Sequence, residues 1–528
     1  MISGPLRGWL REVSESTIAP VEGLPAVSTG PTVPSKGLKS GALGLLSSTV
    51  IALASTAPAY SLAATLGFIV LLVGVKAPFI MLLAFLPMYL IALAYKELNQ
   101  AEPDCGTTFT WATRAFGPRT GWMGGWGIIA ADVICMANLA GIAGSYTYLL
   151  FGADKLAASV LWSTVAGVVW IILMGYVCYR GIEISARLQA ALLGIEMVFL
   201  ALFAVYAIVK VYAGHAGAGA LHPSLSWLWP SDLSVHNIVT ATILTAFIYW
   251  GWDTAVTTNE EADDPGKTPG RAAVLSTVIL VGIYLLVTFA VVAFAGVGTE
   301  GIGLSNEANA SDVFNAMRAE VFGTGTIGVI LQSLLIVTVL TSASASTQTT
   351  ILPTARTVLS MGAAGAVPRR FARIHPRYLT PTWSTGGMIV ASIAFYVVMS
   401  LISDNLLADS IGAIGLMIAF YYGLTGITCV WYYRSHLRHG GKQMWTKGIL
   451  PGLGGLMLIA MFFKAAYDYA KPDYGSTTLF GVGGVFIVGI GSLLVGAVLM
   501  VIYNLIAPEF FKGQTLEKQQ AAPLEPAS

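Results

Sequence analysis

The chain has 528 residues, of which 55% are hydrophobic and only 10% are charged. Soluble proteins carry about 25% charged residues on average, so this composition excludes an ordinary soluble domain and places most of the chain in a lipid membrane. The net charge of +1 excludes the strongly basic surface that attracts nucleic acids, and no nucleic-acid partner is expected.

The chain begins with a polar stretch that is rich in proline and glycine. It has no short apolar core followed by a small-residue cleavage site, so we expect residues 1–38 to form a cytoplasmic tail and not a signal peptide. A membrane-spanning helix needs about 20 mostly apolar residues. Residues 508–528 are expected to form a second cytoplasmic tail. Between the tails, residues 39–507 predict an all-α integral membrane protein with twelve spans: 41–70, 77–97, 121–151, 158–179, 185–211, 236–259, 271–297, 324–352, 384–403, 408–433, 448–470 and 479–506.

The lysine and arginine residues between these spans predict the orientation of the chain. With the N-terminus on the cytoplasmic side, most of the 28 basic residues fall in cytoplasmic segments, as the positive-inside rule requires. Successive loops alternate between the two sides of the membrane, so a missed span would place the later basic loops on the wrong side. We therefore expect a multi-pass protein of the plasma membrane with both termini in the cytoplasm.

The first predicted span is interrupted near its middle. In "IALASTAPAYSLAATLG" (51–67), Ser55, Thr56, Ala57 and Pro58 fall where an unbroken helix is expected. Proline removes a backbone donor and clashes with the preceding turn. Freed backbone groups are tolerated in a membrane only where they line a cavity or meet a ligand, although a simple proline kink explains the sequence equally well.

Two carboxylates in the first half of the chain lie far from either predicted membrane surface. Asp132 is in the third span and Glu196 is in the fifth. A charge at the bilayer centre costs roughly 2.5–3.5 kcal/mol on insertion scales, so both should face the protein interior. Asp132, which shares its span with Asn138, is expected to contact substrate or to join a buried polar network. Glu196 is expected to carry a proton, to bind sodium, to recognise a charged substrate, or only to bond a helix carbonyl.

The sixth predicted span has a second mid-membrane anomaly. In "FIYWGWDTAVTTNEEADDP" (247–265), Gly251 lies among aromatic residues and Asp253 follows two residues later. Gly251 alone would be an ordinary contact between helices, but interrupted helices at corresponding places in two halves point to a transporter site. Asp253 is expected to cap the helix that resumes after the break or to contact a substrate amine.

Polar residues of the eighth span and of two loops complete the candidates. Ser342 and Ser346 in "TSASASTQTT" (341–350) are four residues apart and share a helix face. This face suits ion coordination or the packing of small residues against another helix. The acidic run 260–264 is expected to face the basic segment 369–377 across the cytoplasmic side, as a gate or as a solvated charge cluster.

Three stretches resemble the amino acid–polyamine–organocation (APC) transporters. "FIYWGWDTAVTTNEEADDPGKTPGRA" (247–272) is similar to the family's sixth-helix pattern, and "RGIEISARLQAALLGIE" (180–196) resembles the start of its fifth helix. "LPTARTVLSMGAAGAVPRRFARIHPRYLTPTW" (352–383) resembles its eighth helix and the loop that follows, where several fixed spacings coincide. The resemblance covers roughly residues 38–510.

The resemblance implies a leucine-transporter-like fold and alternating-access transport of an amino acid or amine. Two inverted five-helix repeats would span about 41–211 and 236–433, followed by two extra helices in about 448–506. The family's unwound first helix holds a substrate carboxylate through backbone N–H groups, and carbonyls of its first and sixth helices hold the amino group. The matching positions here are Ser55, Thr56, Ala57, Ala59, Tyr60, Phe247, Ile248, Tyr249 and Trp250, beside which Asp132 and Asp253 are the carboxylates expected to contact substrate.

The same resemblance implies three coupling residues. Glu196 falls where several proton-coupled members place a lysine, and Ser342 and Ser346 fall where sodium-coupled relatives of the fold place hydroxyl ligands. The family's Gly-Ser-Gly turn is absent from the first span, and the hydroxyls of Ser55 and Thr56 would supply donors in its place. A proton, or else a sodium ion, is therefore the expected partner of transport.

These observations together predict a secondary active transporter that takes up an amino acid with a proton. A polyamine or other amine transporter and an amino acid exchanger without ion coupling are the alternatives. No phosphate-binding glycine loop with lysine, paired histidine motif or nucleophile–base set points to an enzyme. The four scattered cysteines predict no metal site and no cofactor is expected, so the remaining partners are the substrate, the ion and membrane lipids.

Overall fold

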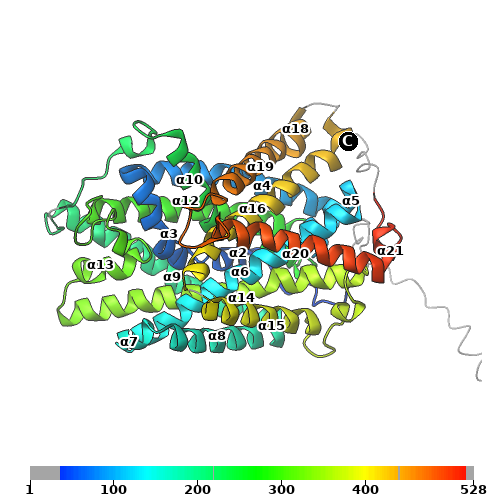
Figure 1. Ribbon diagram of the computed structural model, residues 1–528, viewed down its shortest axis with the longest axis horizontal. Coiled ribbons are helices and arrows are strands. Elements are labelled where there is room, and N and C mark those ends of the chain that lie inside the picture. The colour runs from blue at the N-terminus through cyan, green and yellow to red at the C-terminus, as the bar shows by residue number, and fades with distance from the viewer. Residues whose placement is uncertain (1–35, 218, 403, 438–440, 519–528) are drawn as a thin grey trace, which may run out of the picture. The chain divides into compact units, whose positions relative to one another are not determined.

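The computed structural model describes residues 36–518, apart from residues 218, 403 and 438–440. Most of the two predicted tails, residues 1–35 and 519–528, therefore lies outside the described residues. Nearly all of the regular structure is helical (Figure 1), which confirms the predicted all-α class.

The first half of the described chain forms long helices joined mostly by short loops. They are α2 (Leu45–Thr56), α3 (Pro58–Val73), η1 (Gly74–Lys76), α4 (Ala77–Ala101), α5 (Thr108–Phe116), α6 (Pro118–Leu150), α7 (Asp154–Ala157), α8 (Val160–Arg180), α9 (Ile182–Tyr212), η2 (Leu225–Leu228), α10 (Val235–Ile248), α11 (Thr254–Thr257) and η3 (Asn259–Glu261).

The second half continues with helices and one small hairpin. The elements are α12 (Thr268–Ala295), η4 (Glu307–Asn309), α13 (Val313–Phe322), α14 (Thr326–Ala363), η5 (Arg369–Ala372), α15 (Thr382–Ile402), α16 (Asp404–Tyr432), α17 (Arg434–Leu437), α18 (Gly441–Met444), η6 (Trp445–Ile449), α19 (Leu450–Tyr469), β1 (Thr478–Leu479), β2 (Val482–Gly483), α20 (Gly484–Ile506) and α21 (Pro508–Phe511). Strands β1 and β2 pair antiparallel between α19 and α20.

Ten helical stretches of the described residues are long and apolar enough to cross a membrane, so the protein is a multi-pass membrane protein. One stretch, Leu45–Ala101, runs through α2, α3, η1 and α4 and covers the first two predicted spans. The sixth predicted span holds two shorter helices, α10 with 14 residues and α11 with four. Helix α14 continues to Ala363, well past the predicted end at residue 352, because Pro353 is accommodated inside it.

The first helical break is confined to one residue. Helix α2 ends at Thr56, Ala57 adopts a left-handed conformation with φ 45°, and α3 begins at Pro58. Proline suits the first position of a helix because its missing N–H would have no partner inside the helix there. The predicted interruption is therefore a sharp joint between two helices and not a long unwound segment.

The second break lies directly against the first. Helix α10 ends at Ile248, Gly251 has φ 118°, and a short helix resumes at Thr254. A Cβ atom on Gly251 would lie 2.8 Å from the carbonyl carbon and oxygen of Ser55. The two interruptions thus meet in the interior, where the long helices α6, α14 and α16 also pass (Figure 1).

Candidate functional site

The joint between α2 and α3 is held by side chains from two other helices. The backbone N–H of Ala59 donates to Oε1 of Glu196 in α9 over 2.7 Å. The hydroxyl of Ser342 in α14 donates to the same oxygen over 2.8 Å, and the N–H of Tyr60 donates to Ser342 Oγ over 3.2 Å. The first free donors of α3 are thus paired with Glu196 and Ser342, two of the three residues that the sequence assigned to coupling.

The last carbonyls of α2 are paired in the same way. Ser346 in α14 donates its hydroxyl to the carbonyl of Ser55 over 2.9 Å. The Ser55 hydroxyl lies 2.9 Å from that of Thr254, across the second break, and the hydroxyl of Ser61 donates to the Thr56 carbonyl. The sequence predicted that these backbone groups serve a substrate, whereas the structure shows several of them satisfied by the protein's own side chains.

A small cavity of about 10 Å³ lies at this joint. This is about the space that one water molecule requires, so the central site is closed around no more than that. Of the residues predicted to bind substrate or ion, seven line this cavity: Ser55, Thr56, Ala57, Tyr60, Phe247, Trp250 and Ser346.

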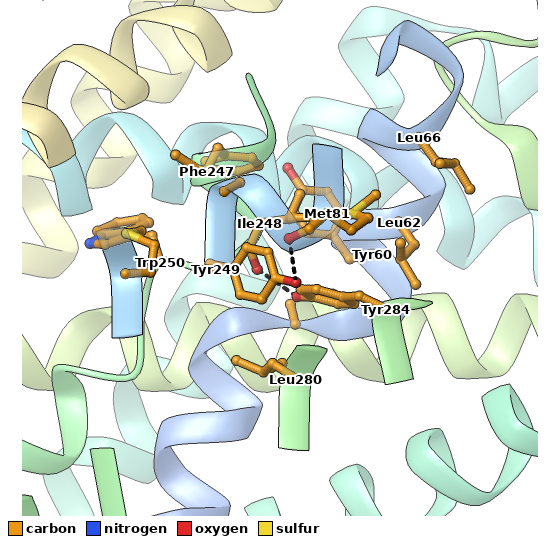
Figure 2. Close-up of a cluster of buried hydrophobic side chains, with 14 of the residues drawn as sticks. Tyr60, Leu62, Leu66, Met81, Phe247, Ile248, Tyr249, Trp250, Leu280 and Tyr284 are labelled. Atoms are coloured by element: carbon orange, nitrogen blue, oxygen red, sulfur yellow. Dashed lines mark hydrogen bonds between the residues drawn. The ribbon is translucent and has the colours of Figure 1, made fainter. Parts of the chain in front are cut away.

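Two other predicted residues of the sixth span, Ile248 and Tyr249, contact neighbouring helices and not the central cavity. The hydroxyl of Tyr249 donates to the Met81 carbonyl over 3.1 Å, and its ring meets that of Tyr284 edge-on with centroids 5.0 Å apart (Figure 2). The Ile248 carbonyl accepts a hydrogen bond from Tyr284. Ile248 and Tyr249 therefore anchor the end of α10 against α4 and α12 and do not line the central cavity.

The two aspartates make buried polar contacts and are not among the described residues that line the central cavity. Asp253 takes the predicted N-cap position of α11, but its side chain makes no cap hydrogen bond there. Its Oδ2 instead accepts the hydroxyl of Tyr421 in α16 over 3.0 Å, and Tyr421 in turn accepts the indole N–H of Trp250. Asp132 accepts the hydroxyl of Thr354 over 2.6 Å, which places it between α6 and α14.

A buried ion-pair network lies on the side where the described chain begins and ends. Lys36 bonds Asp104 over 2.7 Å and Glu260 over 2.5 Å, and Arg356 holds both oxygens of Glu261 over 2.7 and 3.0 Å. The acidic run was expected to face the basic segment 369–377, and this expectation is wrong for Glu260 and Glu261. We call these five residues the terminal-side network.

The charges of the network stabilise one another and shift the pKa values of Lys36 and Asp104. We call the contacts of Lys36 with Asp104 and Glu260 the Lys36 latch. Burial alone would lower the pKa of Lys36, but Cys105, Asp104 and Glu260 together raise it. Burial would raise the pKa of Asp104, but the charge of Lys36 and hydrogen bonds from Lys36, Ser360 and Gly106 outweigh it and lower that pKa. The ligand atoms of Asp104, Cys105 and Glu260 lie within 4.8 Å of one another, and the Lys36 ammonium occupies the position that a cation would take.

Sequence reasoning missed several of these residues. Lys36 lay in the predicted tail and Asp104 in a loop, and their pairing joins positions 68 residues apart. Thr254 and Tyr421 carried no signal beyond a polar group in an apolar span. Only the tyrosine-rich start of "YYGLTG" (421–426) marks α16 as a helix with polar groups to bury.

Comparison with known proteins agrees with this architecture. Residues 43–490 match the amino acid permease family. An uncharacterized transporter of Mycobacterium tuberculosis is 26% identical over 58% of this chain, which covers 63% of that relative, somewhat less than two thirds of its length. The low-affinity putrescine importer of Escherichia coli is 23% identical over 72% of this chain and 78% of its own length. The branched-chain amino acid permease of Lactococcus lactis is 24% identical over 79% and 87%.

Proposed function

This chain belongs to the amino acid permease family and is a transporter, not an enzyme, and on that premise we propose that it takes up an amino acid by alternating access with a proton. We place it in the plasma membrane with both termini in the cytoplasm. In support, Lys36 and the carbonyl of Glu517 both contact the segment 102–114, through Asp104 and Arg114 respectively. The two ends of the described chain therefore lie on one side.

The observation that carries the proposal is the contact between Glu196 and the helix joint. Its carboxylate is fully buried, and Oε1 accepts both the Ala59 N–H and the Ser342 hydroxyl. Its other oxygen, Oε2, has no hydrogen-bond partner among the described residues. One carboxylate thus joins α9, α14 and the break in the first span, and retains a free site for a proton.

Protonation of this carboxylate supplies a physical route to coupling. Hydrogen bonds to an ionised acceptor are roughly twice as strong as those between neutral groups. Adding a proton to Glu196 would weaken its hold on Ala59 and on Ser342, and so loosen the joint. Because such linkage is reciprocal, movement of the joint would in turn change the proton affinity of Glu196.

The substrate would occupy the closed central cavity when the joint opens. Ser55, Thr56, Ala57, Tyr60, Phe247 and Trp250 would contact it, and Ser346 would release the Ser55 carbonyl to it. We assign the two breaks to corresponding helices of two inverted repeats, about 41–211 and 236–433, with the extra helices in about 448–506. The adjacency of Ser55 and Gly251 supports this assignment.

The test is uptake into proteoliposomes of a panel of radiolabelled amino acids and amines, with and without an inward pH gradient, in the absence of sodium. We expect one amino acid to accumulate only with the gradient. Glu196→Gln should reduce this accumulation about tenfold or more, whereas Glu320→Gln, which changes an exposed carboxylate of α13, should not. Uptake that ignores the gradient but rises on preloading with unlabelled substrate would contradict coupling and identify an exchanger.

Transport of an amine is the second candidate function. It is favoured by the similarity to a putrescine importer over 72% of the chain and by the buried carboxylates of Asp132 and Asp253. The same panel decides between the two, because an amine transporter would accumulate putrescine and not the neutral amino acids. In that case Asp253→Asn should abolish amine uptake.

A further inference from the structure

A second, larger cavity lies on the side of the molecule opposite to the terminal-side network. Its volume is about 670 Å³, within the range of small-molecule sites. Helices α3, α6, α7, α8, α10, α15, α16 and α20 line it together with the turn before β1 at Tyr474, Gly475 and Ser476. Tyr60 lines both this outer cavity and the small central cavity, so the two cavities meet at that residue.

Several residues that line the outer cavity carry buried polar atoms without a partner among the described residues. Buried polar groups are nearly always hydrogen-bonded in proteins. Among the described residues, five buried polar atoms without a partner belong to residues that line this cavity: Tyr60 Oη, Thr65 Oγ1, Thr240 Oγ1, Ser400 Oγ and Asp409 Oδ2. The remaining wall is largely apolar, with side chains such as Phe68, Leu72, Ile142 and Leu244.

Among the described lining residues, Asp409 of α16 is the one carboxylate, and only one of its two oxygens has a hydrogen-bond partner. Oδ1 accepts the backbone N–H of Ser476 over 2.6 Å, whereas Oδ2 has no partner among the described residues. The residue is only 4% exposed. Two glycines make room for it, because a Cβ atom on Gly475 would lie 2.6 Å from Oδ1 and one on Gly484 would lie 2.7 Å from Oδ2.

Among the described residues that line the cavity there is no lysine, arginine or histidine. A buried carboxylate without a cationic partner is costly, and a cation that enters the cavity would remove that cost. A protonated amine supplies the charge and up to three N–H donors, which the Oδ2 atom and nearby hydroxyls can accept. An amine with an apolar body would also fill the apolar wall, whereas a carboxylate group would find no basic side chain among the lining residues.

We propose that the outer cavity is a binding site for a primary organic ammonium ion with an apolar body, and that Asp409 is its cation-binding residue. Its place on the route to the central site rests on the proposed transport function, but binding itself does not. A protonated amine and an amino acid both carry a positively charged ammonium group that Asp409 could bind. The lining residues favour the amine, since they offer the carboxylate of an amino acid no cation.

Binding is measured by calorimetric titration of the full chain in lipid nanodiscs, with empty nanodiscs as the blank for partitioning. The probes are isopentylamine, L-leucine and isopentyl alcohol, which share a branched apolar body and differ in their charged groups. We expect isopentylamine to bind most tightly, L-leucine to bind more weakly, and the alcohol to bind at least about tenfold more weakly than the amine, because it lacks the charge-assisted hydrogen bond. Equal binding of alcohol and amine would overturn the proposal.

The variant Asp409→Asn keeps an oxygen for the Ser476 N–H and removes the charge. We expect it to bind isopentylamine at least about tenfold more weakly, while Asp473→Asn, which changes an exposed carboxylate in the same loop, binds as the unchanged protein does. Wild-type affinity in Asp409→Asn overturns the proposal. Tighter binding of L-leucine than of isopentylamine overturns the assignment to amines.

A second variant guards against misfolding of the loop. Ser400 lines the cavity and its hydroxyl has no partner, so Ser400→Leu fills the cavity without breaking a hydrogen bond. It should weaken isopentylamine binding, and undiminished binding would overturn the site even if Asp409→Asn fails to fold. The transport proposal and the outer-site proposal can fail separately. If none of the radiolabelled amino acids and amines is taken up, only the transport proposal is contradicted. If Asp409→Asn and Ser400→Leu bind isopentylamine as the unchanged protein does, only the outer-site proposal is contradicted.

Discussion

Gly251 lies with its Cα against the backbone of Ser55, so that the two interrupted spans touch where each is broken. A Cβ atom at position 251 would lie 2.8 Å from the Ser55 carbonyl group, closer than side-chain carbons normally approach. The φ of Gly251, 118°, is also a conformation that other residues rarely adopt. The contact therefore requires glycine for two independent reasons.

Gly251→Ala should consequently disrupt the joint. We expect a loss of about 1–3 kcal/mol from backbone strain alone, a lower midpoint of thermal unfolding in detergent, and loss of uptake. The control is Gly282→Ala in α12, where an added Cβ meets nothing within 4 Å. Thermal unfolding and proteoliposome uptake of both variants check this, and a Gly251→Ala protein as stable and active as the control would contradict the close contact.

The Arg356–Glu261 pair is the most deeply buried ion pair of the terminal-side network, with side chains 2% and 0% exposed. Removing one partner leaves a buried charge unpaired, which typically costs about 3–5 kcal/mol. Glu261→Gln should therefore lower the unfolding midpoint strongly. The control is Glu509→Gln, which breaks the exposed Arg369–Glu509 pair and should cost less than about 1 kcal/mol. Equal midpoints for the two variants would contradict this account.

Local chemistry made the two breaks predictable from the sequence. Pro58 cannot continue α2 and suits the first position of α3, while Gly251 is the residue that a positive φ favours. Runs of apolar residues likewise made the multi-pass character predictable, although ten stretches of the described residues, and not the predicted twelve, are long and apolar enough to cross a membrane. The length of α14 was not predictable, because an interior proline such as Pro353 is tolerated once neighbouring helices surround it.

The partners of the polar groups were not predictable, because they are set by packing between distant segments. Lys36 and Glu260 are 224 residues apart, and Glu196 and Ala59 are 137 apart. Asp409 stood at the predicted edge of a span, where an aspartate is ordinarily solvated. Only the folded turn at Ser476 buries it and gives it one backbone donor.

Breaking the Lys36 latch should expose Cys105, which is fully buried next to Asp104 and donates its backbone N–H to Glu260. In a protein whose other three cysteines are replaced by alanine, Lys36→Met should raise the labelling rate of Cys105 by a membrane-impermeant maleimide. We expect a rise of about tenfold, which corresponds to a shift of about 1.4 kcal/mol toward the open form.

Lys39→Met is the matched control for that experiment. Lys39 pairs with Glu183 over 2.8 Å, but both side chains are nearly half exposed, so the pair should contribute little. Labelling of Cys105 should remain slow in this variant. If Lys39→Met and Lys36→Met raise the rate equally, the latch is not specific to the Lys36 contacts with Asp104 and Glu260.

The latch also has a defined pH window. The pKa of Asp104 is lowered from its ordinary value of 3.8, so its contribution to stability is present above that pH and is lost as the pH falls through the lower folded value. The pKa of Lys36 is raised from 10.5, so its contribution is present below that pH and is lost as the pH rises through the higher folded value. Because burial without Lys36 raises the pKa of Asp104, the difference in unfolding midpoint between the unchanged protein and Lys36→Met should be largest from about pH 7 to 9 and shrink as the pH falls toward 3. A difference that instead vanished near pH 6 or 7 would assign the stabilisation to another titrating group and contradict the Lys36–Asp104 pair as its source.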